Sequence, residues 1–205
     1  KLAISSPTAQ TTRHRFRAVH TTDSHQIIIV DTPGVHKPHD TLGEELNTTA
    51  LKSLEGIDVA AFVLDASAPF GTGDEWVISQ LAQCSMPKLL VLSKIDLVTQ
   101  EELDLQRQRA LEAGQWDGVV ALSSVTGEQI DTFIELVEQF LPAGPLWFPA
   151  DMETDQPIEV IIAEFIREKI LLTAHDEVPH AVGVVVEDME YNRRKNLEKI
   201  YASVY

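Results

Sequence analysis

Short apolar runs alternate along the chain with longer stretches in which apolar residues recur at helical spacing. The first run, at residues 26–30 (QIIIV), follows the turn-forming residues 22–24 and a more polar, partly alternating segment at residues 14–21. This pattern predicts an edge strand that returns into a buried strand, as a hairpin at the margin of a sheet. Further apolar runs predict three more buried strands, at residues 59–64, 89–92 and 118–122.

Helices are expected between these strands. The segments with helical spacing, or with the polar composition of a surface helix, are residues 42–54, 76–82, 101–113 and 130–141. Short apolar strands that alternate with helices predict a parallel sheet covered on both faces, which is the α/β doubly wound class. Such sheets bind ligands at the carboxyl ends of their strands.

A second region follows a break in this rhythm. Prolines and glycines between residues 142 and 149 predict a linker or wrapping segment over residues 142–157. Beyond it, the spacing predicts a helix over residues 158–170 and strands over 182–187 and 197–205, with a polar connection at 191–195. One helix and a two-stranded hairpin cannot bury a core alone, so we expect this second domain to be cut short.

Composition and charge narrow the function classes. Apolar residues make up 44%, as in an ordinary globular protein, and no stretch approaches the length of a membrane span. The first residues lack the apolar core of a signal peptide, and the single cysteine, Cys84, excludes an internal disulfide, in agreement with a reducing cytosol. We interpret Cys84 as a semi-buried helical thiol.

The net charge of −16 argues against a chain that binds nucleic acid over its whole surface. Any RNA contact must then come from a local basic group or from residues outside this sequence. The local basic groups are Arg13, Arg15 and Arg17, and Arg193, Arg194 and Lys195. A solvated face is an equally good interpretation of both.

Three loops after predicted strands carry candidate chemistry. The first is Asp31-Thr32-Pro33-Gly34. A carboxylate at the end of a parallel strand can hold Mg²⁺ through water, and a glycine lets the backbone approach a terminal phosphate. An Asx turn that closes the strand is the alternative.

The second loop is Ser93-Lys94-Ile95-Asp96 and the third is 123–127 (SSVTG). A carboxylate at Asp96 can accept hydrogen bonds from both N–H groups of the guanine edge, which adenine lacks. The aliphatic stem of Lys94 can lie along the base, and backbone N–H groups of the third loop can meet the guanine carbonyl. Each loop alone is explained by solvated turns and helix caps, but their order and spacing along successive strands favour one mononucleotide site.

The set D-T-P-G, S-K-I-D and S-S-x-T-G, preceded by A-Q-T-T-R-H-R at residues 9–15, resembles the Era family of bacterial GTPases. The stretches IAEFIREKIL at 162–171 and EVPHAVGVVVE at 177–187 are similar to the K-homology RNA-binding domain of that family. The resemblance covers nearly the whole chain. It implies a P-loop-GTPase-like domain at 1–141, a linker at 142–157 and a K-homology-type domain at 158–205.

The resemblance also implies a function. Members of this kind are GTP-hydrolysing switches that use GTP, GDP and Mg²⁺, bind small-subunit ribosomal RNA and assist assembly of the small ribosomal subunit. It implies a cytoplasmic protein with peripheral contact with the inner membrane, although no basic amphipathic segment requires that contact. No DNA partner is expected.

Site residues carry over from the matching motifs. Thr12 and Asp31 would reach Mg²⁺, the latter through water, and Asp96 would read guanine beside Lys94 and the backbone of Ser124. The switch residues implied are Gln10, Thr11, Thr12, Arg13 and His14. The implied GTP-binding residues are Asp31, Thr32, Pro33, Gly34, Val35, Ser93, Lys94, Ile95, Asp96, Ser123, Ser124 and Val125.

Two positions depart from the family pattern. Ser93 stands where the common motif has Asn, so base affinity or loop bracing is expected to be weaker. Val35 stands where many GTPases have a water-positioning Gln, which predicts slow intrinsic hydrolysis. His36 lies nearby, but a solvated switch-loop histidine is the better interpretation than a general base. No catalytic residue can be assigned.

The phosphate-binding motif G-x-x-x-x-G-K-[ST] does not occur in the sequence. In the family it precedes the position of Lys1, together with the first strand and helix, and the RNA-clamping G-x-x-G loop follows Tyr205. We expect a chain that truly begins at Lys1 neither to hold GTP firmly nor to hydrolyse it, and expect the parent protein to carry further residues. The alternative is a non-catalytic fragment that acts only by contact. A related translation GTPase with another appended domain is disfavoured by the IREKIL helix.

Overall fold

The computed structural model describes residues 2–5, 16–32, 54, 56–173, 182–193 and 196–205. It divides the chain into two compact units, Lys1–Gly34 with Leu146–Tyr205 and Val35–Pro145. The helix predicted at residues 42–54 falls almost wholly outside the described residues.

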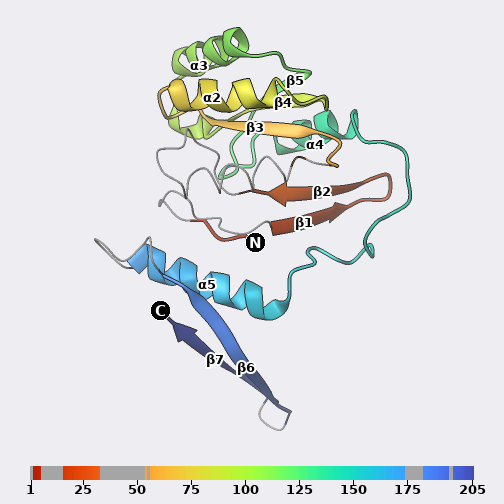
Figure 1. Cartoon of the computed structure of the whole chain (residues 1–205), viewed down its shortest axis with the longest axis vertical. Helices are drawn as coiled ribbons and strands as arrows, with labels where there is room; N and C mark the ends of the chain where they lie inside the picture. Colours follow the sequence, from red (N-terminus) through yellow and green to blue (C-terminus); the bar gives the residue numbers. More distant parts are fainter. Residues whose placement is uncertain (1, 6–15, 33–53, 55, 174–181, 194–195) are drawn as a thin grey trace. The chain divides into compact units, whose positions relative to one another are not determined.

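The unit Val35–Pro145 is built on a parallel three-stranded sheet (Figure 1). Its strands are β3 (Ala60–Asp65), β4 (Lys88–Ser93) and β5 (Gly118–Ala121), in the order β3-β4-β5. The central strand is the most deeply buried, since Leu89, Leu90 and Leu92 are each 0% exposed. A continuous apolar run is expected for a strand buried on both faces.

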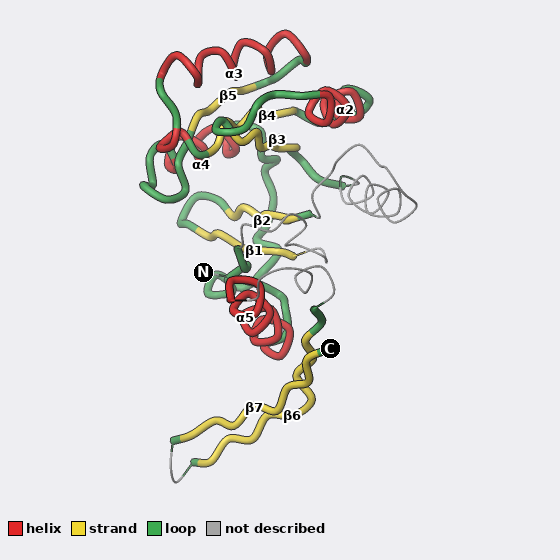
Figure 2. The backbone as a smooth tube through the Cα atoms, turned by 90° about the vertical axis from the view of Figure 1, so that its left-hand side faces the viewer, coloured by secondary structure: helices red, strands yellow, loops and turns green. Residues whose placement is uncertain are grey.

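Helices cover both faces of this sheet, as the sequence predicts. On one face, residues of α2 (Thr72–Leu81) and α3 (Gln100–Ala113) pack with β3 and β4. On the other face, α4 (Ile130–Glu138) packs against β4 and β5. Figure 2 shows α3 and α4 on opposite sides of the strands. The prediction of a parallel α/β sheet is therefore confirmed.

Local sequence explains where these elements begin and how closely they approach. Thr99 caps α3, because its hydroxyl oxygen accepts a hydrogen bond from the Glu102 N–H at 3.3 Å and its own N–H donates to Glu102 Oε2 at 2.8 Å. Gly118 opens β5 at a close contact, since a Cβ there would lie 2.8 Å from the side chain of Leu136, on α4, and 2.9 Å from that of Leu89. Only glycine fits at that contact without displacing a core side chain.

In the other unit, β1 (Phe16–Thr21) and β2 (Gln26–Asp31) form the predicted hairpin. Among the described residues the hairpin forms a two-stranded sheet, and its predicted place at the margin of a larger sheet stays a prediction. The outer edge of β1 is bridged by the later segment, where Ala18 pairs with Thr154.

The predicted linker or wrapping segment packs along this hairpin. The side-chain oxygen of Gln26 accepts hydrogen bonds from the N–H groups of Trp147 and Phe148, at 2.9 and 3.0 Å. Val19 N–H donates to the Glu153 carbonyl at 2.7 Å. The wrapping part is thereby fixed to β1 and β2, while the predicted domain boundaries at 141 and 157 stay predictions.

The same unit contains α5 (Ile158–Thr173) and the antiparallel pair β6 (Val184–Asn192) and β7 (Leu197–Val204). The polar connection predicted at 191–195 is wrong at its start, because Tyr191 and Asn192 still pair across the ladder. Strand pairing there overrides the polar side chains. In the described part of the chain, no helix is both long and apolar enough to cross a bilayer.

Candidate functional site

Three neighbouring strands end in polar side chains at one edge of the parallel sheet. β3 ends at Asp65, β4 leads into Ser93-Lys94-Ile95-Asp96, and Ser123 follows β5. Backbone hydrogen bonds join the loops beyond the strands, from Ala66 N–H to the Ser93 carbonyl (2.9 Å) and from Ile95 N–H to the Leu122 carbonyl (3.4 Å). The loops therefore stay side by side at the carboxyl edge, where α/β sheets bind ligands.

Ser123 fixes the carboxylate of Asp96. Its side chain is 0% exposed, and its hydroxyl donates to Asp96 Oδ1 at 2.5 Å. The hydroxyl oxygen of Ser123 also accepts hydrogen bonds from the N–H groups of Val125 (3.2 Å) and Thr126 (3.1 Å). One buried hydroxyl thus joins the second and third predicted loops, while Asp96 itself stays exposed to a ligand.

Lys94 is held by a carboxylate of the adjacent strand. Its Nζ lies 2.5 Å from Asp65 Oδ2, and its backbone is left-handed, with φ 60°. Asp65 Oδ1 accepts hydrogen bonds from the N–H (2.9 Å) and hydroxyl (2.6 Å) of Ser67. Burial raises the pKa of Asp65 by desolvation, but the hydrogen bonds from Lys94 and Ser67 outweigh this and hold the pKa below its ordinary value.

The remaining residues of the second and third loops have defined surroundings. The Ser93 hydroxyl donates to the Leu64 carbonyl at 3.1 Å and so braces β4 against β3. Ile95 opens a single turn of 3₁₀ helix, Ile95–Leu97. Ser124 and Val125 are exposed on the turn after β5, which is closed by a hydrogen bond from Gly127 N–H to the Ser123 carbonyl at 3.0 Å. Because the Val125 N–H already donates to the Ser123 hydroxyl oxygen, the backbone of Ser124 is the part of this turn offered to a ligand.

The first predicted loop lies in the other unit. Asp31 ends β2, and Asp31 and Thr32 are both half-buried. The other predicted residues of this region, Pro33, Gly34, Val35, Gln10, Thr11, Thr12, Arg13, His14 and His36, lie outside the described residues. Convergence of Asp31 with Asp96, and Mg²⁺ binding by Thr12 and Asp31, stay predictions. The residues that the structure describes include no cluster of three acidic, His or Cys side chains suited to a metal ion.

Sequence reasoning missed Asp65 and Ser67. The signal was present, because Asp65 directly follows the apolar run at 59–64 just as Asp31 follows the run at 26–30. By the argument used for Asp31, Asp65 was also a candidate for contact with a ligand.

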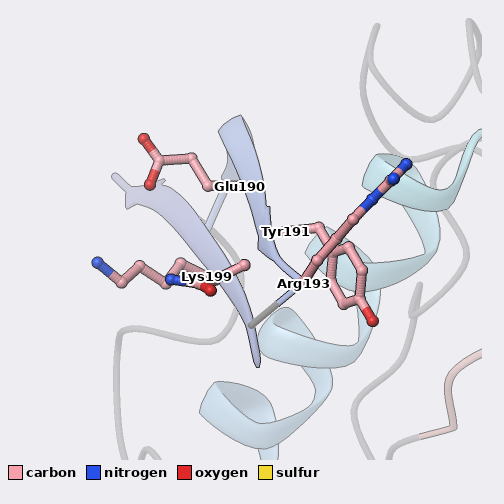
Figure 3. Close-up of a pocket in the computed structure, with 5 residues that line it drawn as sticks. Glu190, Tyr191, Arg193 and Lys199 are labelled. Atoms are coloured by element: carbon pink, nitrogen blue, oxygen red, sulfur yellow. The ribbon is translucent and has the colours of Figure 1, made fainter. Parts of the chain in front are cut away.

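The basic groups have mixed surroundings. Arg17 pairs with Asp155 and lies over the ring of Phe148, 5.9 Å from its centroid, so it has a structural role in its own unit. Arg193 and Lys199 line a shallow hollow of about 600 Å³ near the tip of the β6–β7 hairpin. Figure 3 shows Lys199 and Arg193 extending from different sides of the hairpin. They do not form a convergent anion site.

Comparison with known proteins supplies the family. A family model described as "50S ribosome-binding GTPase" matches residues 1–94. The chain is 37% identical over 205 residues to the GTPase Era of Alkaliphilus metalliredigens, covering 100% of this chain and 70% of that protein. It is 39% identical over 207 aligned residues to the GTPase Era of Clostridioides difficile, covering 100% and 69%.

Solved structures agree with these relatives. A crystal structure of Era with MgGDPNP and nucleotides 1506–1542 of 16S ribosomal RNA superposes with a TM-score of 0.90 at 30% identity, covering 100% of this chain and 70% of that one. A variant of Aquifex aeolicus Era bound to GDP and AlF₄⁻ gives 0.87 at 29% identity, with the same coverages. Sequence relatives over the full chain and the shared α/β fold lead to one assignment: the chain belongs to the Era family of GTPases.

Proposed function

We propose that this protein is a guanine-nucleotide switch that hydrolyses GTP and binds ribosomal RNA of the small subunit. The observation that carries the nucleotide part is the hydrogen bond from the buried Ser123 hydroxyl to Asp96. It holds an exposed carboxylate at the carboxyl edge of a parallel sheet, beside a lysine that Asp65 holds in turn.

The proposed recognition follows from hydrogen-bond chemistry. Asp96 accepts two hydrogen bonds from the N1–H and amino group of guanine, while the stem of Lys94 lies along the base and a backbone N–H at Ser124 meets the guanine carbonyl. Adenine has no matching pair of donors and would leave the carboxylate unpaired, which is costly in a partly desolvated site. This arrangement favours GTP and GDP over their adenine counterparts.

Phosphate and metal chemistry would come from the first loop. The carboxylate of Asp31, at the end of β2, is an oxygen ligand of the type that Mg²⁺ prefers. A bound Mg²⁺ would neutralise phosphate charge while the terminal phosphoryl group of GTP is transferred to water. Within this proposal, Thr12 would reach the ion, Asp31 would hold it through water, and Gly34 would donate a backbone N–H to the terminal phosphate.

The RNA part is proposed for the unit that contains α5, β6 and β7. The order α5, β6, β7 is compatible with the opening of a K-homology-type domain, and the related Era structure contains a segment of 16S ribosomal RNA. In this proposal, the protein assists assembly of the small subunit, works in the cytoplasm and makes peripheral contact with the inner membrane. The motifs that resemble the family support these assignments.

The nucleotide proposal predicts the result of a competition assay with the full-length protein. A fluorescent GDP analogue in Mg²⁺ buffer is expected to be displaced by unlabelled GTP or GDP. ATP in about hundred-fold excess is expected to leave it bound. Equal displacement by ATP would contradict guanine recognition. Absence of any nucleotide binding would favour the alternative of a non-catalytic protein that acts by contact.

Ser123→Ala is expected to weaken GDP binding by roughly ten-fold, because Asp96 loses the donor that orients it and two N–H groups lose their acceptor. Titration of the fluorescent GDP analogue measures this change. Ser79→Ala, which removes an exposed hydroxyl on α2, is the matched control and is expected to bind as the wild type does. Equal affinities for all three proteins would show that Ser123 does not position Asp96.

A further inference from the structure

We infer that Asp65 is a positioning residue for guanine-nucleotide recognition, which acts by holding the Lys94 side chain at the end of β4. This inference rests on the proposed nucleotide function. Its basis is the 2.5 Å contact between Lys94 Nζ and Asp65 Oδ2, which joins two residues 29 positions apart in the sequence.

Hydrogen bonds from Ser67 orient the carboxylate of Asp65. Its Oδ1 accepts two hydrogen bonds from Ser67, from the backbone N–H at 2.9 Å and from the hydroxyl at 2.6 Å. Its Oδ2 is then directed to Lys94. Because Ser67 binds Oδ1 twice, contacts within its own loop orient the carboxylate and leave Oδ2 for Lys94.

The sheet fixes the spacing between the two partners. Asp65 lies opposite Ser93, the residue before Lys94, in the parallel ladder between β3 and β4. The pairing continues past the strand ends through the hydrogen bond from Ala66 N–H to the Ser93 carbonyl, at 2.9 Å. Lys94 also has a left-handed backbone, which is uncommon for a residue with a side chain. The contact is therefore a product of ordered backbone on both sides.

Folding stability does not account for this arrangement. The side chains of Lys94 and Asp65 are 53% and 33% exposed, and ion pairs with this exposure contribute little to stability. What the pair does fix is the course of a long side chain next to Asp96. A lysine stem held in one conformation loses less entropy when a base packs on it.

The ion pair also determines whether Lys94 interacts with the base or with the phosphates of the nucleotide. With its ammonium group neutralised by Asp65, the lysine offers its aliphatic stem to a ligand and not a free charge for phosphate. Loss of Asp65 is therefore expected to affect GDP and GTP equally. If Lys94 served the phosphates instead, removing its carboxylate partner would strengthen binding, and would do so more for GTP.

The test is a double-mutant cycle in the full-length protein, with fluorescent GDP and GTP analogues. Asp65→Asn is expected to raise the dissociation constant of both nucleotides by about three- to five-fold. In a Lys94→Met background, which keeps an unbranched stem but removes the charge, Asp65→Asn is expected to have no further effect. Asp58→Asn, an exposed carboxylate just before β3, is the control and is expected to match the wild type.

Several outcomes overturn the inference. It fails if Asp65→Asn binds both nucleotides as the wild type does, or if its loss of affinity persists in the Lys94→Met background, which would indicate a structural effect on the loop. Tighter GTP binding by Asp65→Asn would also overturn it, in favour of a phosphate role for Lys94. If the wild type binds no guanine nucleotide, the proposed function falls and this inference with it.

Discussion

Asp96→Asn is expected to lower the affinity for GDP by about 100-fold, the largest effect of any single change at the site. The substitution replaces a charged acceptor by an amide with only one acceptor atom, and its NH₂ group would face the guanine amino group, donor to donor. The hydroxyl of Ser123, now 2.5 Å from Asp96 Oδ1, would at best keep one neutral partner. Isothermal titration with GDP and Mg²⁺ measures the change.

The same variant makes a gain-of-function test possible. Xanthine carries a carbonyl where guanine carries its amino group, so the amide of the Asp96→Asn variant can donate to it. Affinity for xanthosine diphosphate is expected to rise as affinity for GDP falls. Asp104→Asn, which alters an exposed carboxylate on α3, controls for general effects of lost charge. Parallel losses for GDP and xanthosine diphosphate in Asp96→Asn would contradict direct base reading by Asp96.

Leu90→Ala is expected to lower the free energy of unfolding by about 3 kcal/mol. Leu90 lies in the central strand β4, is 0% exposed, and packs in the cluster formed with α2 and α3. Truncation removes buried methyl groups and leaves a cavity that a strand held by ladders on both sides cannot close. Urea denaturation followed by circular dichroism measures the difference.

Leu105→Ala is the matched control for this stability prediction. Leu105 lies on α3 and is 48% exposed, so the same truncation there leaves no cavity. Its effect is expected to stay within about 0.5 kcal/mol. Similar unfolding midpoints for the two variants would show that β4 is not the centre of the core.

The strands of the parallel sheet were predictable because their buried residues give short apolar runs in the sequence. The run at 89–92 is apolar because both faces of β4 are buried. In β3 only one face is buried, that of Ala60, Phe62 and Leu64, whereas Ala61 and Val63 are exposed although they are apolar. Helix positions followed from spacing, and the α3 cap from Thr99 and Glu102. These signals are local, so no knowledge of distant contacts was needed.

Contacts between distant segments were not predictable in the same way. No pattern in residues 14–31 predicts that Thr154 bridges to Ala18, or that Gln26 binds the backbone of Trp147. Tyr191 and Asn192 look like a turn until the ladder with β7 is known. At the candidate site, Asp96 and Ser123 were both predicted as ligand-binding residues. The hydrogen bond between them and the ion pair of Asp65 with Lys94 are visible only in the three-dimensional structure.

The burial of β4 has a consequence for the energetics of ligand capture. The strand is almost fully enclosed up to Leu92, and the recognition loop begins at the next residue. This loop is anchored to a rigid strand and is hydrogen-bonded to the loops after β3 and β5. It therefore loses little conformational entropy when a nucleotide binds. We expect its amide protons to exchange slowly even without ligand, and its shape to change little on binding.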